Sequence, residues 1–280
     1  MSNEVEVSIV CNTYNHGKYI RDALNGFVMQ KTDFKYEVLV HDDASTDNTA
    51  EIIREFEKEY PDIIKPIYQK ENQYHKVFSI LCEFQYPRVK GKYIAMCEGD
   101  DYWTDPYKLQ KQYDSLKAHP GIDICAHSSD LINAEDGSVQ GKVHHYDEVT
   151  VIPVEDVISG GGSFVATSSL FFKKEIVTEP LKFFEINPID YTIQIGGSLR
   201  GGMLYLPDNM SAYRVSVPGS WSVKVDKNRK ANLVSVNETM ACLKQLDTDT
   251  GKKYHKMLSK MIFRLFLAKI HLKLLILFNR

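Results

Sequence analysis

Apolar residues recur along the first half of the chain with two different periods, and the two periods alternate. Short runs of strand-forming residues predict β-strands, and stretches in which apolar residues return every three or four positions predict helices. The predicted strands are 7–11, 36–40, 64–68, 93–97 and 122–126, and the predicted helices are 20–28, 52–60, 77–84 and 106–119. Strands separated by helices of this length imply an α/β fold with a mostly parallel, doubly wound sheet.

The alternation breaks after about residue 128. Three glycines follow one another at 160–162, the predicted strands 169–172 and 203–206 are short, and a helix is predicted over 190–199. From Lys253 onward the chain is predicted to form one long helix. We therefore predict one domain, with an α/β half over 1–127 and a smaller second half over 128–235, followed by a C-terminal helical tail over 236–280.

Composition and charge narrow the classes of protein. Apolar residues make up 43% and charged residues 25% of the 280, as in ordinary globular proteins. The net charge of −3 comprises +8 over residues 251–280 and −11 over the rest. An acidic body is a poor general binder of nucleic acid, so we expect no nucleic-acid partner.

The five cysteines form no Cys-x-x-Cys pair, which favours buried reduced thiols over disulfides or zinc ligands. The N-terminal residues lack the pattern of a signal peptide, so we expect a cytoplasmic protein.

Two pairs of aspartates directly follow predicted strands. Asp42 and Asp43 come after the second strand, and Asp100 and Asp101 after the fourth. Ligands of open α/β sheets bind beyond the carboxyl ends of the strands, where these pairs are expected to lie. Each pair alone is also typical of a turn, since aspartate is favoured there. Two pairs at two strand ends favour a binding site instead.

Carboxylates at such an edge suit the chemistry of an activated sugar. A nucleotide sugar leaves behind a nucleoside diphosphate, which gains negative charge as the glycosidic bond breaks. A hard cation such as Mn²⁺ or Mg²⁺, held by a few carboxylates and by the phosphates, stabilises that charge. A carboxylate can also accept hydrogen bonds from ribose hydroxyls or from a pyrimidine N–H.

Three motifs resemble those of the family 2 glycosyltransferases, which have the GT-A fold and act by inversion. The run Val7-Ser8-Ile9-Val10-Cys11-Asn12-Thr13-Tyr14-Asn15 is similar to the family's first strand. His41-Asp42-Asp43-Ala44-Ser45-Thr46-Asp47 is similar to its V-D-D-G-S-T-D motif, with Ala44 in place of glycine. Glu98-Gly99-Asp100-Asp101 is similar to its metal-binding Asp-x-Asp region. The motifs occur in the family's order.

The resemblance implies roles for individual residues. Asn12, Tyr14 and Asp43 would line the nucleobase pocket, and Asp43 would accept a hydrogen bond from the base. Asp100 would lie near the ribose and the metal, and Asp101 would be the main metal ligand. Residues 1–127 would then be the nucleotide-sugar-binding half, and residues 128–235 the acceptor-side half.

An inverting transfer also needs a general base for the acceptor hydroxyl. Asp190, at the start of a predicted helix in a segment similar to the family's acceptor side, is our candidate; the alternative is that it only caps the helix. Arg214 suits the diphosphate, or it pairs with an aspartate for structural reasons. The histidine that often follows the family's Tyr-Arg pair is replaced by Val215-Ser216, which makes a histidine metal ligand doubtful.

Two tryptophans are secondary candidates. Trp103 either stacks on a sugar or fills the core, and the segment 218–222, with Trp221, has the composition of a mobile loop that could close over the donor. The family's Gln-x-x-Arg-Trp motif, which marks processive synthases, does not occur in the sequence, so a single transfer is favoured.

The tail predicts a basic amphipathic helix. Lys253, Lys256, Lys260, Arg264 and His271 share one face, while Met257, Leu258, Met261, Ile262, Leu265 and Phe266 lie largely away from it. Such a helix is suited to the surface of an anionic membrane, and the enzyme would then be peripheral at the inner face of the cell membrane. The alternative is that it docks on the acidic body of the protein or on another subunit.

The sequence therefore predicts an inverting, metal-dependent, non-processive glycosyltransferase. Its donor would be a nucleotide sugar, most simply a UDP-sugar, and its acceptor a glycan or a lipid-linked sugar of bacterial surface polysaccharide, a context that comes from the resemblance. A nucleotidyltransferase that makes nucleotide sugars is a second hypothesis, against which stands the lack of a Gly-rich phosphate loop after the first strand. A non-catalytic nucleotide-binding scaffold is a third.

Overall fold

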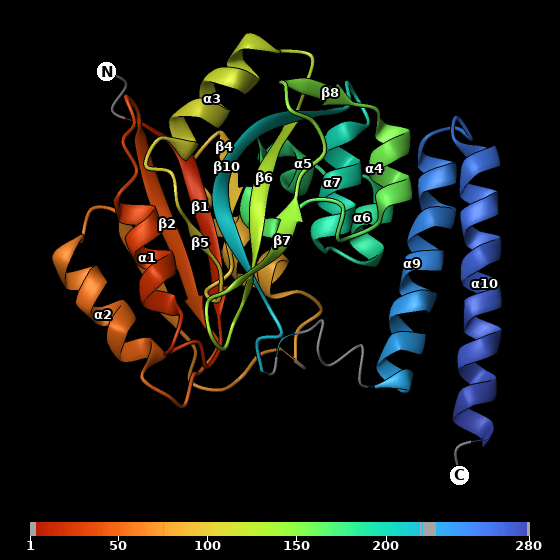
Figure 1. Ribbon diagram of the computed structural model, residues 1–280, viewed down its shortest axis with the longest axis horizontal. Helices are drawn as coiled ribbons and strands as arrows, with labels where there is room; N and C mark the ends of the chain where they lie inside the picture. Colours follow the sequence, from red (N-terminus) through yellow and green to blue (C-terminus); the bar gives the residue numbers. More distant parts are fainter. Residues whose placement is uncertain (1–3, 75, 219, 221–227, 279–280) are drawn as a thin grey trace.

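A single curved sheet forms the centre of the computed structural model (Figure 1), which describes residues 4–74, 76–218, 220 and 228–278. The order of its strands is β3-β2-β1-β4-β9-β6-β10-β5, with β7 beside β6 and β8 beside β10. The strands are β1 (Val5–Thr13), β2 (Lys35–Asp42), β3 (Ile64–Tyr68), β4 (Tyr93–Met96), β5 (Tyr102–Trp103), β6 (Ile124–Asn133), β7 (Val139–Val143), β8 (Thr150–Ile152), β9 (Phe171–Lys173) and β10 (Met203–Val215). Strands β1 to β4 pair in parallel, as do β6 and β10, so the predicted α/β class with a mostly parallel sheet is confirmed.

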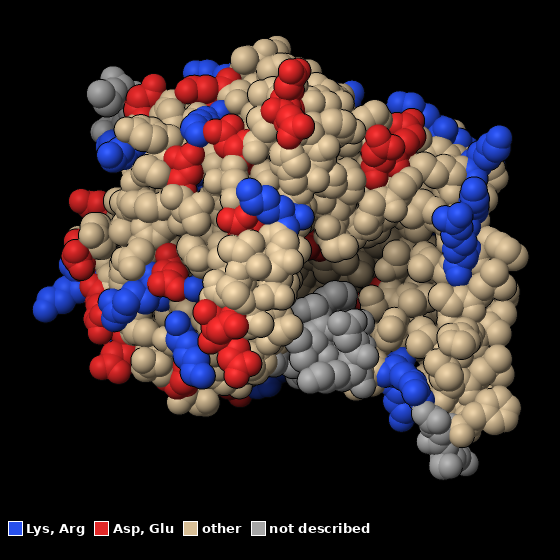
Figure 2. Space-filling model, in the orientation of Figure 1, with Lys and Arg blue, Asp and Glu red and all other residues tan. Residues whose placement is uncertain are grey.

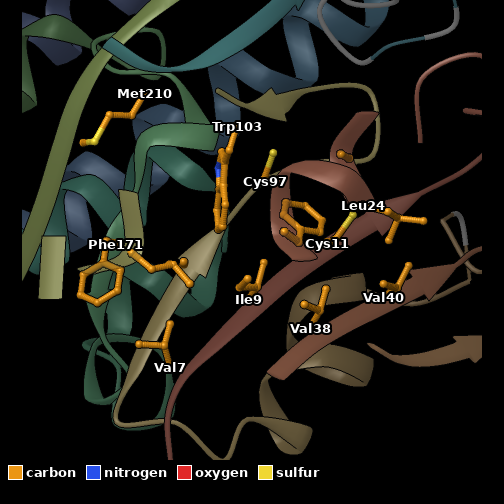
Figure 3. Close-up of a cluster of buried hydrophobic side chains, with 14 of the residues drawn as sticks. Val7, Ile9, Cys11, Leu24, Val38, Val40, Cys97, Trp103, Phe171 and Met210 are labelled. Atoms are coloured by element: carbon orange, nitrogen blue, oxygen red, sulfur yellow. The ribbon is translucent and has the colours of Figure 1, made fainter. Parts of the chain in front are cut away.

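Two apolar layers cover the two faces of the sheet, because successive side chains of a strand point to opposite faces. Val7, Ile9 and Cys11 of β1 face α1 (Ile20–Val28), α2 (Thr49–Glu59) and α3 (Lys108–Ala118), as Figure 3 shows for part of this cluster. Val10 faces the opposite cluster, which includes Val157 of α4 (Val154–Gly160) and Ile193 of α7 (Asp190–Ser198). Both layers hold β1 in the middle of the sheet.

One predicted element was wrong, and a second was shorter than the strand that the structure contains. The helix predicted over 77–84 is instead a π-helical turn at Leu81–Gln85 followed by a 3₁₀ turn at Tyr86–Arg88. The reason is tertiary: the buried Gln85 amide donates to the carbonyls of Cys11 and Leu39. The strand predicted over 203–206 continues to Val215, because β10 pairs with β6 on both sides of an irregularity at 206–209, next to Pro207.

The remaining helices lie between residues 154 and 198 and at the C-terminus. Short helices α5 (Glu175–Thr178) and α6 (Lys182–Ile186) precede α7, and η3 (Thr167–Ser169) is a 3₁₀ turn. The predicted C-terminal helix is present as α10 (His255–Phe278), but it is the second arm of a hairpin whose first arm is α9 (Arg229–Asp249). Our division at residue 235 lies within α9. Figure 1 shows the hairpin standing at one side of the body, with α9 inside and α10 outside.

The tail's apolar face is largely used inside the protein. Leu258 is fully buried, and Met257, Met261, Ile262 and Leu265 pack against the cluster formed by α4, α6, α7 and α9. For this face of α10, the structure therefore agrees with the alternative prediction, in which the helix docks on the body of the same protein. All five cysteines are free, as predicted; four are buried and Cys82 is exposed.

Candidate functional site

The site begins where β1 lies between the two acidic segments. Residues 12 and 13 of β1 pair with His41 and Asp42 of β2, and the amide of Gly99 donates to the carbonyl of Asn12 over 3.0 Å. The approach at Gly99 is so close that a Cβ there would lie 2.6 Å from Oγ1 of Thr13. The parallel sheet therefore brings Asp43 and the segment 98–101 to one edge, as the sequence predicts.

Asp43 is held by the loop that follows β3. Its carboxylate accepts hydrogen bonds from the backbone N–H of Gln73 at 2.7 Å and of Tyr74 at 3.2 Å, and its carbonyl accepts from the Asn72 side chain. An ionised carboxylate can accept about four hydrogen bonds. The Asp43 carboxylate can therefore accept one from a nucleobase N–H in addition to the two from the backbone.

The other two residues predicted for the nucleobase pocket lie on the same edge. The Asn12 Oδ1 accepts from the Gln85 amide at 3.2 Å, and the Tyr14 ring is 42% exposed. Gln85, which fixes Asn12, was missed by sequence reasoning because its partners lie on two strands that are distant in the sequence, β1 and β2. His16, also missed, places Nε2 3.8 Å from Oδ2 of Asp100.

Asp101 has one satisfied oxygen and one without a partner. Its Oδ1 accepts from the backbone N–H of Arg214 at 2.8 Å, whereas its buried Oδ2 has no hydrogen-bond partner among the described residues. Burial and the neighbouring charge of Asp100 raise the pKa of Asp101 well above its usual range. A cation bound at this oxygen would supply the positive charge that the surrounding protein does not, so Oδ2 is suited to be a cation ligand.

The oxygen donors fit a hard divalent cation only together with a substrate. Within the described ranges, no three His, Cys, Asp or Glu side chains converge as a ready-made metal cage. Asp101 and Asp100 can supply a few ligands, and the phosphates of a nucleotide would supply others, as is common for Mg²⁺ sites.

Glu98 is a further carboxylate in this cluster and was missed as a functional residue. Its side chain is exposed, but the surrounding protein excludes part of the water, and Asp100 and Asp190 add negative charge. These two causes, in that order, raise the pKa of Glu98 to about 8. The contribution of Asp190, which is remote in sequence, is consistent with a position near these carboxylates.

Asp190 is the first residue of α7 and is fixed by two hydrogen bonds. Its Oδ2 accepts from the Thr167 hydroxyl at 2.9 Å, and its Oδ1 accepts from the backbone N–H of Tyr191 at 2.7 Å. Desolvation raises the pKa of Asp190, and both hydrogen bonds counteract that rise. The bond to Tyr191 lies within the first helical turn, while the bond to Thr167 ties Asp190 to η3.

Tyr213 and Arg214 leave β10 on opposite faces. Tyr213 lies on the same face of β10 as Ser211, because alternate side chains of a strand share a face. The Ser211 hydroxyl hydrogen-bonds to the hydroxyl of Ser168, the residue that follows Thr167. Burial raises the pKa of Tyr213, and the negative charges of nearby carboxylates raise it further, in the order Asp101, Glu98, Asp100 and Asp190. The phenol of Tyr213 therefore stays protonated. Sequence reasoning assigned Tyr213 no role, because only the register of β10 reveals its neighbours.

Arg214 is engaged by the protein itself. Its guanidinium donates to the Asp100 carbonyl at 2.7 Å, pairs with Asp22, and lies over the rings of Tyr19 and Tyr102. These contacts correspond to the structural alternative, in which Arg214 holds the loop that carries Asp100 and Asp101; its role toward the diphosphate stays a prediction.

Trp103 belongs to the core. It is 2% exposed, its Nε1 donates to the Ser168 carbonyl at 2.9 Å, and its ring contacts Phe27 edge-on. Stacking of Trp103 on a sugar is therefore wrong. Trp221 lies outside the described residues.

Comparisons with known proteins agree with this geometry. The family model described as Glycosyl transferase family 2 matches residues 8–214. An uncharacterized Mycobacterium tuberculosis protein is 34% identical over 225 residues, which are 80% of this chain and 63% of that protein. TuaG of Bacillus subtilis, whose name assigns it to teichuronic acid biosynthesis, is 30% identical over 144 residues, 51% of this chain and 53% of TuaG. The chain thus spans less than two thirds of the length of these relatives.

Two solved structures share the fold. Staphylococcus aureus TarS 1–349 in complex with UDP-GlcNAc has a TM-score of 0.60 at 14% identity, over 87% of this chain and 72% of that one. The mannosyltransferase PcManGT of Pyrobaculum calidifontis, in complex with GDP-Man and Mn²⁺, has a TM-score of 0.61 at 15% identity, over 97% of this chain and 72% of that one. At these identities the likeness establishes the GT-A fold alone.

Proposed function

The chain belongs to glycosyl transferase family 2, and from that premise we propose that it transfers one sugar from a nucleotide sugar, a UDP-sugar, to a hydroxyl of a glycan or lipid-linked acceptor. The transfer inverts the anomeric centre and depends on Mn²⁺ or Mg²⁺. The observation that carries the proposal is the partnerless buried Oδ2 of Asp101 beside Asp100, with Asp190 facing the same centre. That TarS and PcManGT are described with UDP-GlcNAc and with GDP-Man and Mn²⁺ supports the donor class.

The reaction assigns each residue a task. Asp43, Asn12 and Tyr14 hold the nucleobase, and Asp100 and Asp101 hold the cation, which when bound stabilises the charge that develops on the diphosphate. The acceptor oxygen attacks the anomeric carbon, its proton passes to the Asp190 carboxylate, and the bond from the sugar to the diphosphate breaks with its electron pair on the diphosphate. Thr167 keeps Asp190 oriented for this proton transfer. Arg214 positions the Asp100–Asp101 loop.

The cellular setting extends the proposal. We infer a role in bacterial surface polysaccharide biosynthesis, which the printed role of TuaG supports. The described part of the chain contains no helix with the length and apolarity that crossing a bilayer requires. We place the enzyme in the cytoplasm, in contact with the inner face of the membrane through the C-terminal helix.

A hydrolysis screen tests the function directly. UDP-, GDP- and dTDP-sugars are incubated with the protein, with and without Mn²⁺, and released nucleoside diphosphate is measured. We expect turnover of a UDP-sugar only with the cation. Binding of a nucleotide without turnover of any donor would favour the non-catalytic scaffold.

The Asp190→Asn variant separates binding from catalysis. It should bind UDP like the wild type but lose transfer, because the amide cannot accept the acceptor's proton. Full transfer activity in this variant would remove Asp190 from the mechanism.

A further inference from the structure

Helix α10 carries a second apolar face, which points away from the hairpin. Seven large apolar side chains are between 42% (Ile270) and 81% (Phe278) exposed. These residues, which we call the outer stripe, are Phe263, Phe266, Leu267, Ile270, Leu274, Leu277 and Phe278. Their spacing of three and four places them along one side of the helix. This face differs from the one that packs on α9, and it was not distinguished in the sequence.

The exposure of the stripe is not explained by packing. Beyond Leu265 no residue of α10 belongs to the buried cluster that joins the hairpin to the body. Scattered exposed apolar residues are normal in proteins, but a continuous row on one helix marks an interaction surface. We therefore expect the outer stripe to bind a partner with an apolar interior.

The charges around the stripe identify that partner. Lys260, Arg264 and His271 flank one side of the stripe, and Lys273 flanks the other, all of them exposed. Residues 251–280 contain eight Lys and Arg and no acidic residue. Figure 2 shows blue and tan over α10, whereas red groups gather over the body. A second copy of α10 would bring like charges together, while an anionic lipid surface attracts them.

We propose that α10 lies in the interface of an anionic lipid bilayer, with the outer stripe inserted among the acyl chains and the flanking Lys and Arg side chains at the lipid phosphates. Two faces of α10 have different partners. Met257, Leu258 and Leu265 attach α10 to the enzyme, and the outer stripe attaches it to lipid. The basic residues account for a helix that rests on the surface without crossing it.

Docking through α10 also bears on the acceptor. This inference about the acceptor rests on the proposed function, whereas the docking itself does not. In Figure 1 the parallel strands β1 and β2 run toward the end of the molecule at which α10 also ends. With α10 flat in the interface, these strands run along the bilayer surface, and the carboxylate edge lies at the same end of the molecule as the C-terminal end of α10. A lipid-linked sugar, confined to that surface, is the acceptor that docking favours.

Vesicle sedimentation of the full chain tests the docking. The probes are vesicles of phosphatidylcholine alone and vesicles containing about 30% phosphatidylglycerol, a fraction chosen to match the anionic charge of a cytoplasmic leaflet. The stripe variant is Phe266→Gln, Ile270→Gln and Leu274→Gln together, and the charge variant is Lys260→Gln, Arg264→Gln and Lys273→Gln together. The matched control replaces three exposed valines of the body, Val139→Gln, Val149→Gln and Val151→Gln.

We expect the wild type and the control to bind the anionic vesicles. The charge variant should bind about 100-fold more weakly, because each basic residue near the surface contributes roughly a factor of five. The stripe variant should lose binding to both kinds of vesicle. Melting temperatures and donor hydrolysis in solution should be unchanged in both variants, since none of the six residues is buried or near the carboxylates.

Two results would overturn the proposal. One is equal vesicle binding by the wild type and the stripe variant. The other is a stable dimer in sedimentation velocity that the stripe variant abolishes, together with no vesicle binding by the wild type, which would assign the stripe to a second copy of the chain. Because hydrolysis of the donor is measured without vesicles, failure of the docking and failure of the glycosyltransferase assignment are distinguishable.

Discussion

The backbone N–H of Arg214 donates a hydrogen bond to Oδ1 of Asp101 over 2.8 Å, and thereby ties the end of β10 to the loop that follows β4. The bond leaves Oδ2 of the same carboxylate buried and without a partner in the described structure. One oxygen therefore fixes the loop, while the other is available to the proposed cation. Substitutions that preserve one function and remove the other can test this division.

Asp101→Asn should retain the fold and lose the cation. The amide oxygen can still accept from Arg214, but the side chain no longer carries charge, so Mn²⁺-dependent UDP binding should weaken by about 100-fold or more. The unfolding temperature of the metal-free variant should equal or exceed that of the wild type, because a buried charge is removed. Asp101→Ala should lose both binding and stability. Titration calorimetry with UDP and Mn²⁺, and thermal unfolding, measure the two effects.

Thr167 should set the pH range over which Asp190 acts as a base. Its hydroxyl stabilises the ionised carboxylate, so Thr167→Val should raise the pKa of Asp190 further and shift the acidic limb of kcat/KM upward. A hydrogen bond to a charged group contributes about 1.5–3 kcal/mol, which corresponds to roughly one to two pH units. Thr167→Ser keeps the hydroxyl and should keep the wild-type profile. If the valine variant shows an unmoved acidic limb, Asp190 is not the titrating base.

Glu98 should make the metal-free protein less stable as the pH rises. In the unfolded chain Glu98 ionises near its ordinary pKa of 4.5, whereas in the folded protein it keeps its proton until about pH 8. The stability that it contributes is therefore complete below pH 4.5 and is lost between pH 4.5 and 8. Glu98→Gln should unfold at a higher temperature than the wild type at pH 9, by only a few degrees because the side chain is exposed and screened.

The control for Glu98 is Glu148→Gln, an exposed substitution outside the helices and outside the cluster. Its unfolding temperature should follow the wild type at every pH. Saturating Mn²⁺ and UDP should reduce the effect of Glu98→Gln, since the cation neutralises the cluster. If the unfolding temperatures of the wild type and of Glu98→Gln were equal from pH 4 to pH 9, burial and the neighbouring carboxylates would not raise the pKa of Glu98.

Asp43 should couple the nucleotide pocket to the loop after β3. Asp43→Asn turns an N–H₂ group toward backbone donors, so at least one of the bonds to Gln73 and Tyr74 is lost. Hydrogen exchange of these two amides should accelerate by about tenfold, as expected for one hydrogen bond of about 1–1.5 kcal/mol. UDP affinity should fall as well. Unchanged protection of both amides would show that the carboxylate does not hold the loop.

Much of the fold follows from local sequence. The strands around 7–11, 36–40 and 93–97 are continuous apolar runs, and a buried parallel strand has no other composition. Because parallel strands end at one edge, the proximity of Asp43 to Asp101 could be predicted without coordinates. The helix at 190–199 was predictable from its spacing, and it carries Asp190.

Other features depend on partners that are distant in the chain. The turn at Leu81–Gln85 is π-helical because the Gln85 amide serves carbonyls of β1 and β2, which no local pattern records. The length of β10 depends on its pairing with β6. The raised pKa values of Glu98 and Tyr213 depend on which charges surround them, and these charges come from separate segments.

The sequence by itself determined the α/β class, the carboxylate edge and the cationic tail, because periodicity and motifs act over a few residues. Only the tertiary structure decided that Arg214 clamps the Asp100–Asp101 loop, that Trp103 is core, and which face of α10 remains exposed. Helical spacing shows that α10 has apolar faces, but which of them α9 covers is a matter of packing between residues far apart in the chain.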